Sequence, residues 1–167
     1  NTYTNGLSAG AYSVSGSVSV VDINKNTKSK VAGILDSGRD ISLTSDDNLT
    51  VDTETGNAAF GAAIGAGAAV SVVNVEGNTE ASMASNTKAD AVGVTRVQAN
   101  GLNNITGLTM SGAAAGIAGV AGAVGVNVIK DSVKAFAGNN VEINKNATSA
   151  TQDVIIEADS NTSVNTD

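Results

Sequence analysis

The sequence predicts an all-β fold, a right-handed parallel β-helix (β-solenoid) of stacked coils. Three observations favour this fold class: short runs in which apolar and polar residues alternate, a long-period internal repeat, and the complete absence of proline. Each proline would remove one backbone donor from a sheet, so a continuous hydrogen-bond ladder tolerates none. Right-handed winding is the default expectation, by analogy with other parallel crossovers.

The repeat is visible in three copies of one phrase. Val18-Ser19-Val20-Val21-Asp22-Ile23 recurs as Val70-Ser71-Val72-Val73-Asn74-Val75 and, more loosely, as Val124-Gly125-Val126-Asn127-Val128-Ile129. The spacings are 52 and 54 residues. A β-sandwich has no reason to repeat its sequence at this period, whereas stacked coils do. We therefore expect one β-solenoid segment of three related repeats, at about residues 1–57, 58–111 and 112–167, cut from a longer chain.

Each repeat continues in a similar way. After the phrase comes a second alternating run, in which positions 27, 29 and 31 are small or apolar and position 28 is charged. A third strand is expected at residues 41–43, 92–97 and 154–156 of the successive repeats, and Gly/Ala-rich segments separate the repeats. Asparagine tolerates the left-handed conformation of a sharp corner. We therefore expect corners at Asn24-Lys25-Asn26, Gly138-Asn139-Asn140 and Asn144-Lys145-Asn146.

Composition limits the interior. With two Phe, two Tyr and no Trp, large side chains cannot fill a core, so we expect a slim interior of valine, alanine and glycine. A coil of about 18 residues and a coil of about 27 residues both divide the repeat evenly, and strands stack roughly 4.8 Å apart in either case. The sequence leaves this choice open.

Composition also excludes several kinds of function. The chain has no cysteine and no histidine, which removes disulfides, thiolate metal sites, cysteine nucleophiles and the commonest general base. Its net charge of −7 is spread without a basic run, which argues against nucleic-acid binding. The opening residues are polar and do not form a signal peptide, so a secreted parent would contain this piece internally.

One phrase resembles a known family. Residues 65–81, beginning Gly65-Ala66-Gly67-Ala68-Ala69-Val70, are similar to a repeat of leukotoxin-type and filamentous-haemagglutinin-like adhesins, and the similarity extends to all three repeats, weakest in the first. These are giant type V secreted proteins of Gram-negative bacteria. The resemblance implies a β-helical passenger, export across the outer membrane, an extracellular or cell-surface location, and attachment or toxicity toward host cells through a surface receptor or glycan. It carries no catalytic motif.

The uncharged run at residues 112–129 raises the possibility of membrane insertion. It contains Gly112, Gly116, Gly119, Gly122 and Gly125. Glycine and alanine contribute little transfer energy, and an equivalent run occurs in the second repeat. We therefore interpret it as a stretch where two backbones approach closely, and we expect no membrane insertion by this segment.

Other candidate residues have ordinary interpretations. The carboxylates that could offer oxygen to Ca²⁺ are Asp46 with Asp47 (followed by Asn48), Asp36 with Asp40, and Asp52 with Glu54. No calcium-binding nonapeptide is present, so we interpret them as solvated carboxylates in turns. The aromatics Tyr3, Tyr12, Phe60 and Phe136 and the arginines Arg39 and Arg96 are too scattered for a sugar-binding site. Phe136 is expected to point outward as a single surface aromatic. The glycosylation patterns at Asn48, Asn104, Asn146 and Asn161 are expected by chance in an Asn/Thr-rich chain.

No catalytic, cofactor-binding or metal-binding residue is therefore assigned, and we expect no enzyme and no cofactor. The leading hypothesis is a structural and adhesive segment. A membrane-active toxin segment, a carbohydrate-active β-helix and an ice-binding face stay open as alternatives, the last weakened because Thr27, Thr79 and Thr109 occur singly. The oligomeric state is not predicted.

Overall fold

The computed structural model describes residues 1–146 and 152–167, and these residues contain strands and turns but no helix. The strands are β1 (Thr2–Val31), β2 (Ile34–Ser37), β3 (Ile41–Met83), β4 (Lys88–Ala91), β5 (Thr95–Ala115), β6 (Ala118–Ala137), β7 (Glu142–Ile143) and β8 (Val154–Thr166). All of their pairings are parallel. The predicted all-β class is confirmed, and the long parallel strands are consistent with a β-solenoid-like fold.

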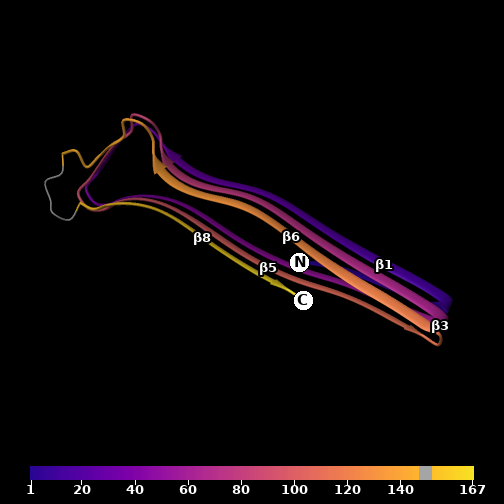
Figure 1. Ribbon diagram of the computed structural model, residues 1–167. Coiled ribbons are helices and arrows are strands. Elements are labelled where there is room, and N and C mark those ends of the chain that lie inside the picture. Colours follow the sequence, from indigo (N-terminus) through magenta and orange to yellow (C-terminus); the bar gives the residue numbers. More distant parts are fainter. Residues whose placement is uncertain (147–151) are drawn as a thin grey trace.

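The long strands form two facing walls (Figure 1). In the first wall, residues 12–31 of β1 pair with residues 64–83 of β3, which pair with β6. In the second wall, residues 2–10 of β1 pair with β3. Residues 41–61 of β3 pair with β5 on the other side, and β5 pairs with β8. β1 and β3 contribute to both walls because β1 turns sharply between Gly10 and Tyr12 and β3 turns between Gly61 and Ile64. We call the end of the molecule that contains these turns the tip.

The strand register follows the sequence repeat. Val18 pairs with Val70, and Val70 pairs with Val124, at the spacings of 52 and 54 residues found in the sequence. Neither an 18-residue nor a 27-residue coil fits this register. Both lengths are wrong because each wall is a straight run of about twenty residues, such as 12–31, without an internal corner. The chain passes once along each wall per repeat.

A short third sheet closes the end opposite the tip. Here β2, β4 and β7 pair in that order, and positive φ angles at Asn86, Asn140 and Asn144 allow the chain to turn. The corners predicted at residues 138–140 and 144–146 are confirmed. The corner predicted at residues 24–26 is wrong, because these residues lie within β1, where alternation continues through them.

The predicted third strand of each repeat is confirmed at residues 41–43 and 154–156, which lie in β3 and β8. In the second repeat, residues 92–94 form a bend and β5 begins only at Thr95. The bend is held by the carboxylate of Asp40, which accepts a hydrogen bond from the backbone N–H of Val94 at 2.7 Å. A valine-rich segment therefore does not always form a strand, because a neighbouring side chain can accept the hydrogen bond from a backbone N–H that a strand partner would otherwise accept.

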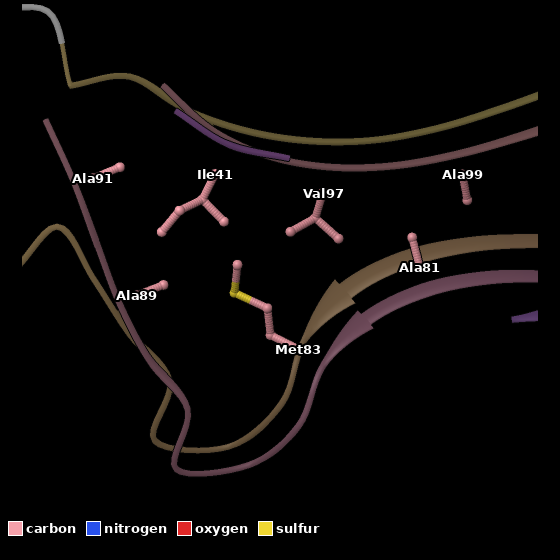
Figure 2. Close-up of a cluster of buried hydrophobic side chains, with 7 residues drawn as sticks. All are labelled: Ile41, Ala81, Met83, Ala89, Ala91, Val97 and Ala99. Atoms are coloured by element: carbon pink, nitrogen blue, oxygen red, sulfur yellow. The ribbon is translucent and has the colours of Figure 1, made fainter. Parts of the chain in front are cut away.

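Two apolar clusters lie between the walls. The larger one is next to the third sheet and surrounds Met83, which packs with Ile41 and Val97 among alanines (Figure 2). The second cluster lies nearer the tip and contains Val51, Val73, Val75 and Ile105. These clusters agree with the expected interior of small and β-branched side chains.

Near the tip the interior is polar, which corrects the expected interior of valine, alanine and glycine. In β1 the buried residues are Ser13, Ser15, Ser17 and Ser19, while the valines between them point outward. Small side chains are required here because the walls converge. A Cβ added to Gly65 would lie 3.0 Å from the carbonyl oxygen of Ala114 on the opposite wall. A valine side chain would not fit at Gly65.

Candidate functional site

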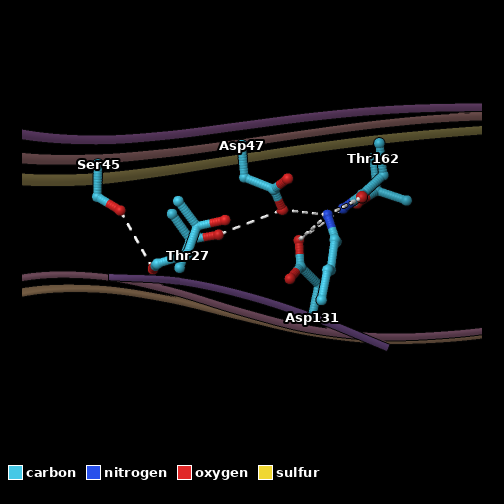
Figure 3. A network of polar contacts seen from close by, with 8 residues as sticks. Thr27, Ser45, Asp47, Asp131 and Thr162 are labelled. Carbon is cyan, nitrogen blue, oxygen red and sulfur yellow. Dashed lines mark hydrogen bonds and ion pairs between the residues drawn. The ribbon is translucent and has the colours of Figure 1, made fainter. Parts of the chain in front are cut away.

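A cluster of ionic and amide side chains lies between the two apolar clusters (Figure 3). The ammonium of Lys25, from the first wall, forms an ion pair with Asp47 of the second wall and lies 4.0 Å from Asp131 Oδ2. Lys25 Nζ also donates to Asn103 Oδ1 at 2.6 Å, and Asn103 Nδ2 donates to Asp131 Oδ2 at 2.6 Å. We call Lys25, Asp47, Asn103 and Asp131 the ionic cluster.

Two hydroxyl groups extend the ionic cluster. Thr79 Oγ1 donates to Asp47 Oδ2 at 3.4 Å, and Asn103 Nδ2 also lies 3.4 Å from Thr162 Oγ1. The cluster therefore links strands of both walls, because Lys25 and Asp131 come from β1 and β6 and Asp47 and Asn103 come from β3 and β5. No single segment of the chain contains the site.

Two glycines make room for the ionic cluster. Gly77 pairs with both Lys25 and Asp131, and a Cβ at Gly77 would meet Asp131 Oδ1 at 2.1 Å and Lys25 Cε at 2.7 Å. Gly101 pairs with Asp47, and its Cβ would lie 2.6 Å from Val133 Cγ2. The absence of a side chain at Gly77 allows Lys25 and Asp131 to meet across β3.

The ionic cluster is well shielded from water. The side chain of Asp131 is 4% exposed, and those of Lys25 and Asp47 are 12% and 13% exposed. One ammonium faces two carboxylates, so the cluster carries one excess negative charge. Asp131 Oδ1 is buried and has no hydrogen-bond partner. An unpartnered carboxylate oxygen in such a place is costly, which marks this site as more than packing.

A hollow of about 410 Å³ lies on the outer surface of the first wall, over the strand positions of Lys25, Gly77 and Asp131. Glu76 and Lys130, which form an exposed ion pair at 3.6 Å, also line it.

The carboxylates considered for calcium do not converge. Asp46 and Asp47 are sequence neighbours in a strand, so they lie on opposite surfaces: Asp46 is exposed and accepts from Asn100 Nδ2 at 2.6 Å, whereas Asp47 belongs to the ionic cluster. The carboxylate of Asp40 already accepts a hydrogen bond from the backbone N–H of Val94. Among the described residues, no group of three or more His, Cys, Asp or Glu is arranged to hold a metal ion.

The remaining candidate residues are exposed and dispersed. Tyr3, Tyr12 and Phe60 lie toward the tip, and the expected outward position of Phe136 is confirmed, with 42% exposure. Arg39 and Arg96 are exposed as well. The glycosylation-pattern asparagines Asn48, Asn104, Asn146 and Asn161 are exposed, and Thr148 of the third pattern lies outside the described residues.

The threonines considered for ice binding face the interior. Thr27 pairs with Thr79, which is fully buried, and Thr109 pairs with Thr55, which is also fully buried. These pairs form where the register brings threonines together, although the residues are distant in sequence. They belong to the interior and not to a flat outer face.

Among the glycines of residues 112–129, the expected close approach of backbones is confirmed at Gly116 and Gly119 and is wrong at Gly122, where nothing lies within 4 Å of an added Cβ. A Cβ at Gly119 would lie 3.0 Å from the carbonyl oxygen of Ala113, and a Cβ at Gly116 would lie 2.5 Å from that of Ala62. In the part of the chain that the structure describes, no helix has the length and hydropathy to span a membrane.

The outer surface of the first wall near the tip is apolar. Its outward residues are in register from strand to strand, in rows such as Val14 with Ala66 and Val120, Val18 with Val70 and Val124, and Val20 with Val72 and Val126. No charged residue points outward until Asp22, which accepts a hydrogen bond from Asn74. We call this region the valine surface. The outward side chains of the valine surface are apolar, whereas the inward side chains directly beneath them are rich in serine.

Polar side chains form ladders on other parts of the surface. Asn26 accepts from Asn78, and Asn86 accepts from Asn140. On the third sheet Glu142 contacts Lys145 at 2.7 Å and Lys88 at 3.4 Å. The hydrogen bond from Lys145 lowers the pKa of Glu142, and the same bond raises the pKa of Lys145. The Lys145 side chain is exposed and that of Glu142 is partly exposed, so solvent screens the interaction.

Comparisons with protein-family models, with curated proteins and with solved structures found no match for this chain. The ionic cluster is thus defined by geometry alone. Sequence reasoning missed it because Asn24-Lys25-Asn26 and Asp46-Asp47-Asn48 were interpreted as polar turns. A usable indication was present: with strict alternation from Val21, Lys25 falls on the inward side of the strand.

Proposed function

We propose that this chain is a structural and adhesive segment of a large secreted bacterial surface protein, in which it presents binding regions to host cells. The observation that supports this proposal is the parallel pairing of whole repeats, such as Val18 with Val70 and Val124. Repeats that pair in this way extend a structure by simple addition. The proposed complete fold is a right-handed parallel β-helix of stacked coils, since parallel crossovers strongly prefer that hand.

The proposed location is the bacterial surface, after export across the outer membrane. A host receptor or glycan is the proposed partner, bound through outer faces or neighbouring regions, and the chain itself has no catalytic role in this proposal. The acidic, proline-free and cysteine-free composition supports an extracellular strand-rich passenger. Polar ladders such as Asn26 with Asn78 are suited to a solvated outer surface.

Deleting one repeat from the parent gene tests this proposal. Residues 64–117 would be removed so that residue 63 joins residue 118, which keeps the register because Ile64 and Ala118 are paired neighbours. We expect export and folding to continue and host-cell attachment to weaken, with attachment restored by reinserting the same repeat. Unchanged attachment, or turnover of a glycan panel by the purified chain, would contradict a structural and adhesive role.

The valine surface favours one alternative, a membrane-active segment of a toxin. An outward sheet surface without charge is compatible with lipid contact. Leakage of dye-loaded liposomes by the chain would support this alternative if the triple variant Val18→Thr, Val70→Thr, Val124→Thr, which replaces one outward methyl group with a hydroxyl group at each position, abolished the leakage. We expect no leakage from either protein.

A further inference from the structure

We propose that Lys25 and Asp47 condense to an intramolecular isopeptide bond, a covalent link between the first and second walls. The two side chains form an ion pair between apolar clusters, and an amide would remove both of the opposite charges from the interior. Buried opposite charges are expensive to keep because their desolvation offsets their attraction. This modification does not depend on the proposed adhesive function.

The groups around the ion pair have the positions that the reaction needs. Asn103, which is fully buried, accepts from Lys25 Nζ through Oδ1 and therefore orients the nitrogen. Asp131 Oδ2 lies 4.0 Å from the same nitrogen and is held by Asn103 Nδ2. Because the reactants are held together by the fold, the effective concentration of amine at the carboxyl group is very high.

The reaction balances without any other reagent. Lys25 passes a proton to the Asp47 carboxylate, which gives a neutral amine and a neutral carboxylic acid. The amine lone pair attacks Cγ of Asp47, and the C–N bond forms. Asp131 takes a proton from the attacking nitrogen and returns it to the leaving hydroxyl group, so the C–O bond breaks and water leaves. Asp131 ends as it began, and its Oδ2, which lies 4.0 Å from Lys25 Nζ, is the oxygen that carries that proton.

Gly77 leaves the space in which the reacting groups meet, because it pairs with both Lys25 and Asp131. Gly77 has a direct part in this geometry, since any side chain there would overlap Asp131 Oδ1. In this scheme Asn103 is a positioning residue and Asp131 is the catalytic residue.

Intact-mass spectrometry of the folded, purified chain tests the proposal. We expect a mass lower than that of the sequence by one water molecule. Digestion with trypsin should then give a branched peptide that joins residues 1–28 to residues 40–88, because trypsin does not cleave after a modified Lys25. The full sequence mass after prolonged incubation of the folded protein would overturn the proposal, and so would loss of ammonia with a link to Asn103.

Matched variants separate the isopeptide from other losses of water. Lys25→Arg keeps the positive charge but removes the nucleophilic amine, so it should have the full mass, while Lys28→Arg at an exposed position should still lose water. Asp131→Asn should slow the mass change by about 100-fold or more, the usual contribution of a general acid-base group, with an unchanged circular-dichroism spectrum. Loss of water that persists in Lys25→Arg would indicate a cyclic imide instead and would overturn the proposal.

Discussion

Val20 and Val21 are neighbours in the sequence and lie on opposite surfaces of the first wall. Val20 is 66% exposed, whereas Val21 packs against the inner cluster of Val73, Val75 and Ile105. On the tip side of this pair the valines point outward, and on the other side the apolar residues point inward. The pair Val72 and Val73 has the same arrangement in the next strand. A doublet of valines therefore marks the position where the polarity of the strand inverts.

The first prediction compares valines on the two surfaces. Replacing Val73, which is fully buried, with threonine should lower the free energy of unfolding by about 1–3 kcal/mol, because an unpaired hydroxyl enters an apolar cluster. Replacing Val14, which is 79% exposed, with threonine should change it by less than about 0.5 kcal/mol. Urea denaturation measures both values. Equal losses would show that the valine surface is not a solvent-facing surface.

The second prediction concerns the close approach at Gly77. Gly77→Ala should destabilise the protein strongly, since its Cβ would overlap Asp131 Oδ1 and Lys25 Cε. Gly122→Ala in the same wall is the control, because nothing lies within 4 Å of a Cβ there. Thermal melting followed by circular dichroism should show a clear decrease in Tm for the first variant only. A similar Tm for both variants would mean that the ionic cluster rearranges easily.

The third prediction concerns the charge balance of the ionic cluster. Relative to the chain in which Lys25 and Asp47 are not covalently joined, Lys25→Met leaves Asp47 and Asp131 without a cation, and removing one partner of a buried ion pair costs about 3–5 kcal/mol. Lys28→Met, at an exposed position, should be nearly neutral. Unfolding in guanidinium chloride compares the two variants. A neutral Lys25→Met would indicate that solvent already screens this part of the interior.

The fourth prediction concerns the apolar cluster at the third sheet. Met83 is fully buried and has the largest side chain among the fully buried residues. Met83→Ala should cost about 2–5 kcal/mol through lost burial and the cavity left behind. Met110→Ala is the matched control, because that methionine is 51% exposed. Chemical denaturation of both variants gives the comparison, and a loss below about 1 kcal/mol for Met83→Ala would mean that the walls collapse to fill the space.

The fifth prediction concerns pH. Because Lys145 lowers the pKa of Glu142, the ionised form is favoured in the folded protein, and its contribution is present above the unfolded pKa of a glutamate and lost as the pH falls through the lowered folded value. Glu142→Gln should therefore lower Tm slightly at neutral pH and should match the unmodified protein in strong acid. Added salt should reduce the difference at neutral pH. A difference that persists in acid and in high salt would point to a cause other than this ion pair.

The sequence predicted the strands and their pairing better than it predicted the interior. The repeat from Val18 to Val70 and Val124 is also the strand register, because identical positions of successive repeats lie side by side. Alternation placed residues 27, 29 and 31 inward and Phe136 outward correctly. These predictions are correct because they depend on the alternation of apolar and polar residues and on the repeat period. Both can be found in a single sequence.

The ionic cluster and the polar tip were not predicted, for physical reasons. Lys25, Asp47, Asn103 and Asp131 meet only because separate strands stack and glycines leave space between them. The serines near the tip are buried because the walls converge. The alternation of residues within one strand does not predict the spacing between the walls. The same Val-Ser pattern describes a strand with either surface inside.

Each strand pairs with the equivalent strand of the next repeat, and this register affects how the protein bends. Each repeat of more than fifty residues advances the stack by roughly 4.8 Å, while the strands extend about twenty residues across it. A stack with so wide and thin a cross-section bends easily across its thin dimension and resists bending across its wide dimension. Bending of the assembled protein should therefore occur in one plane.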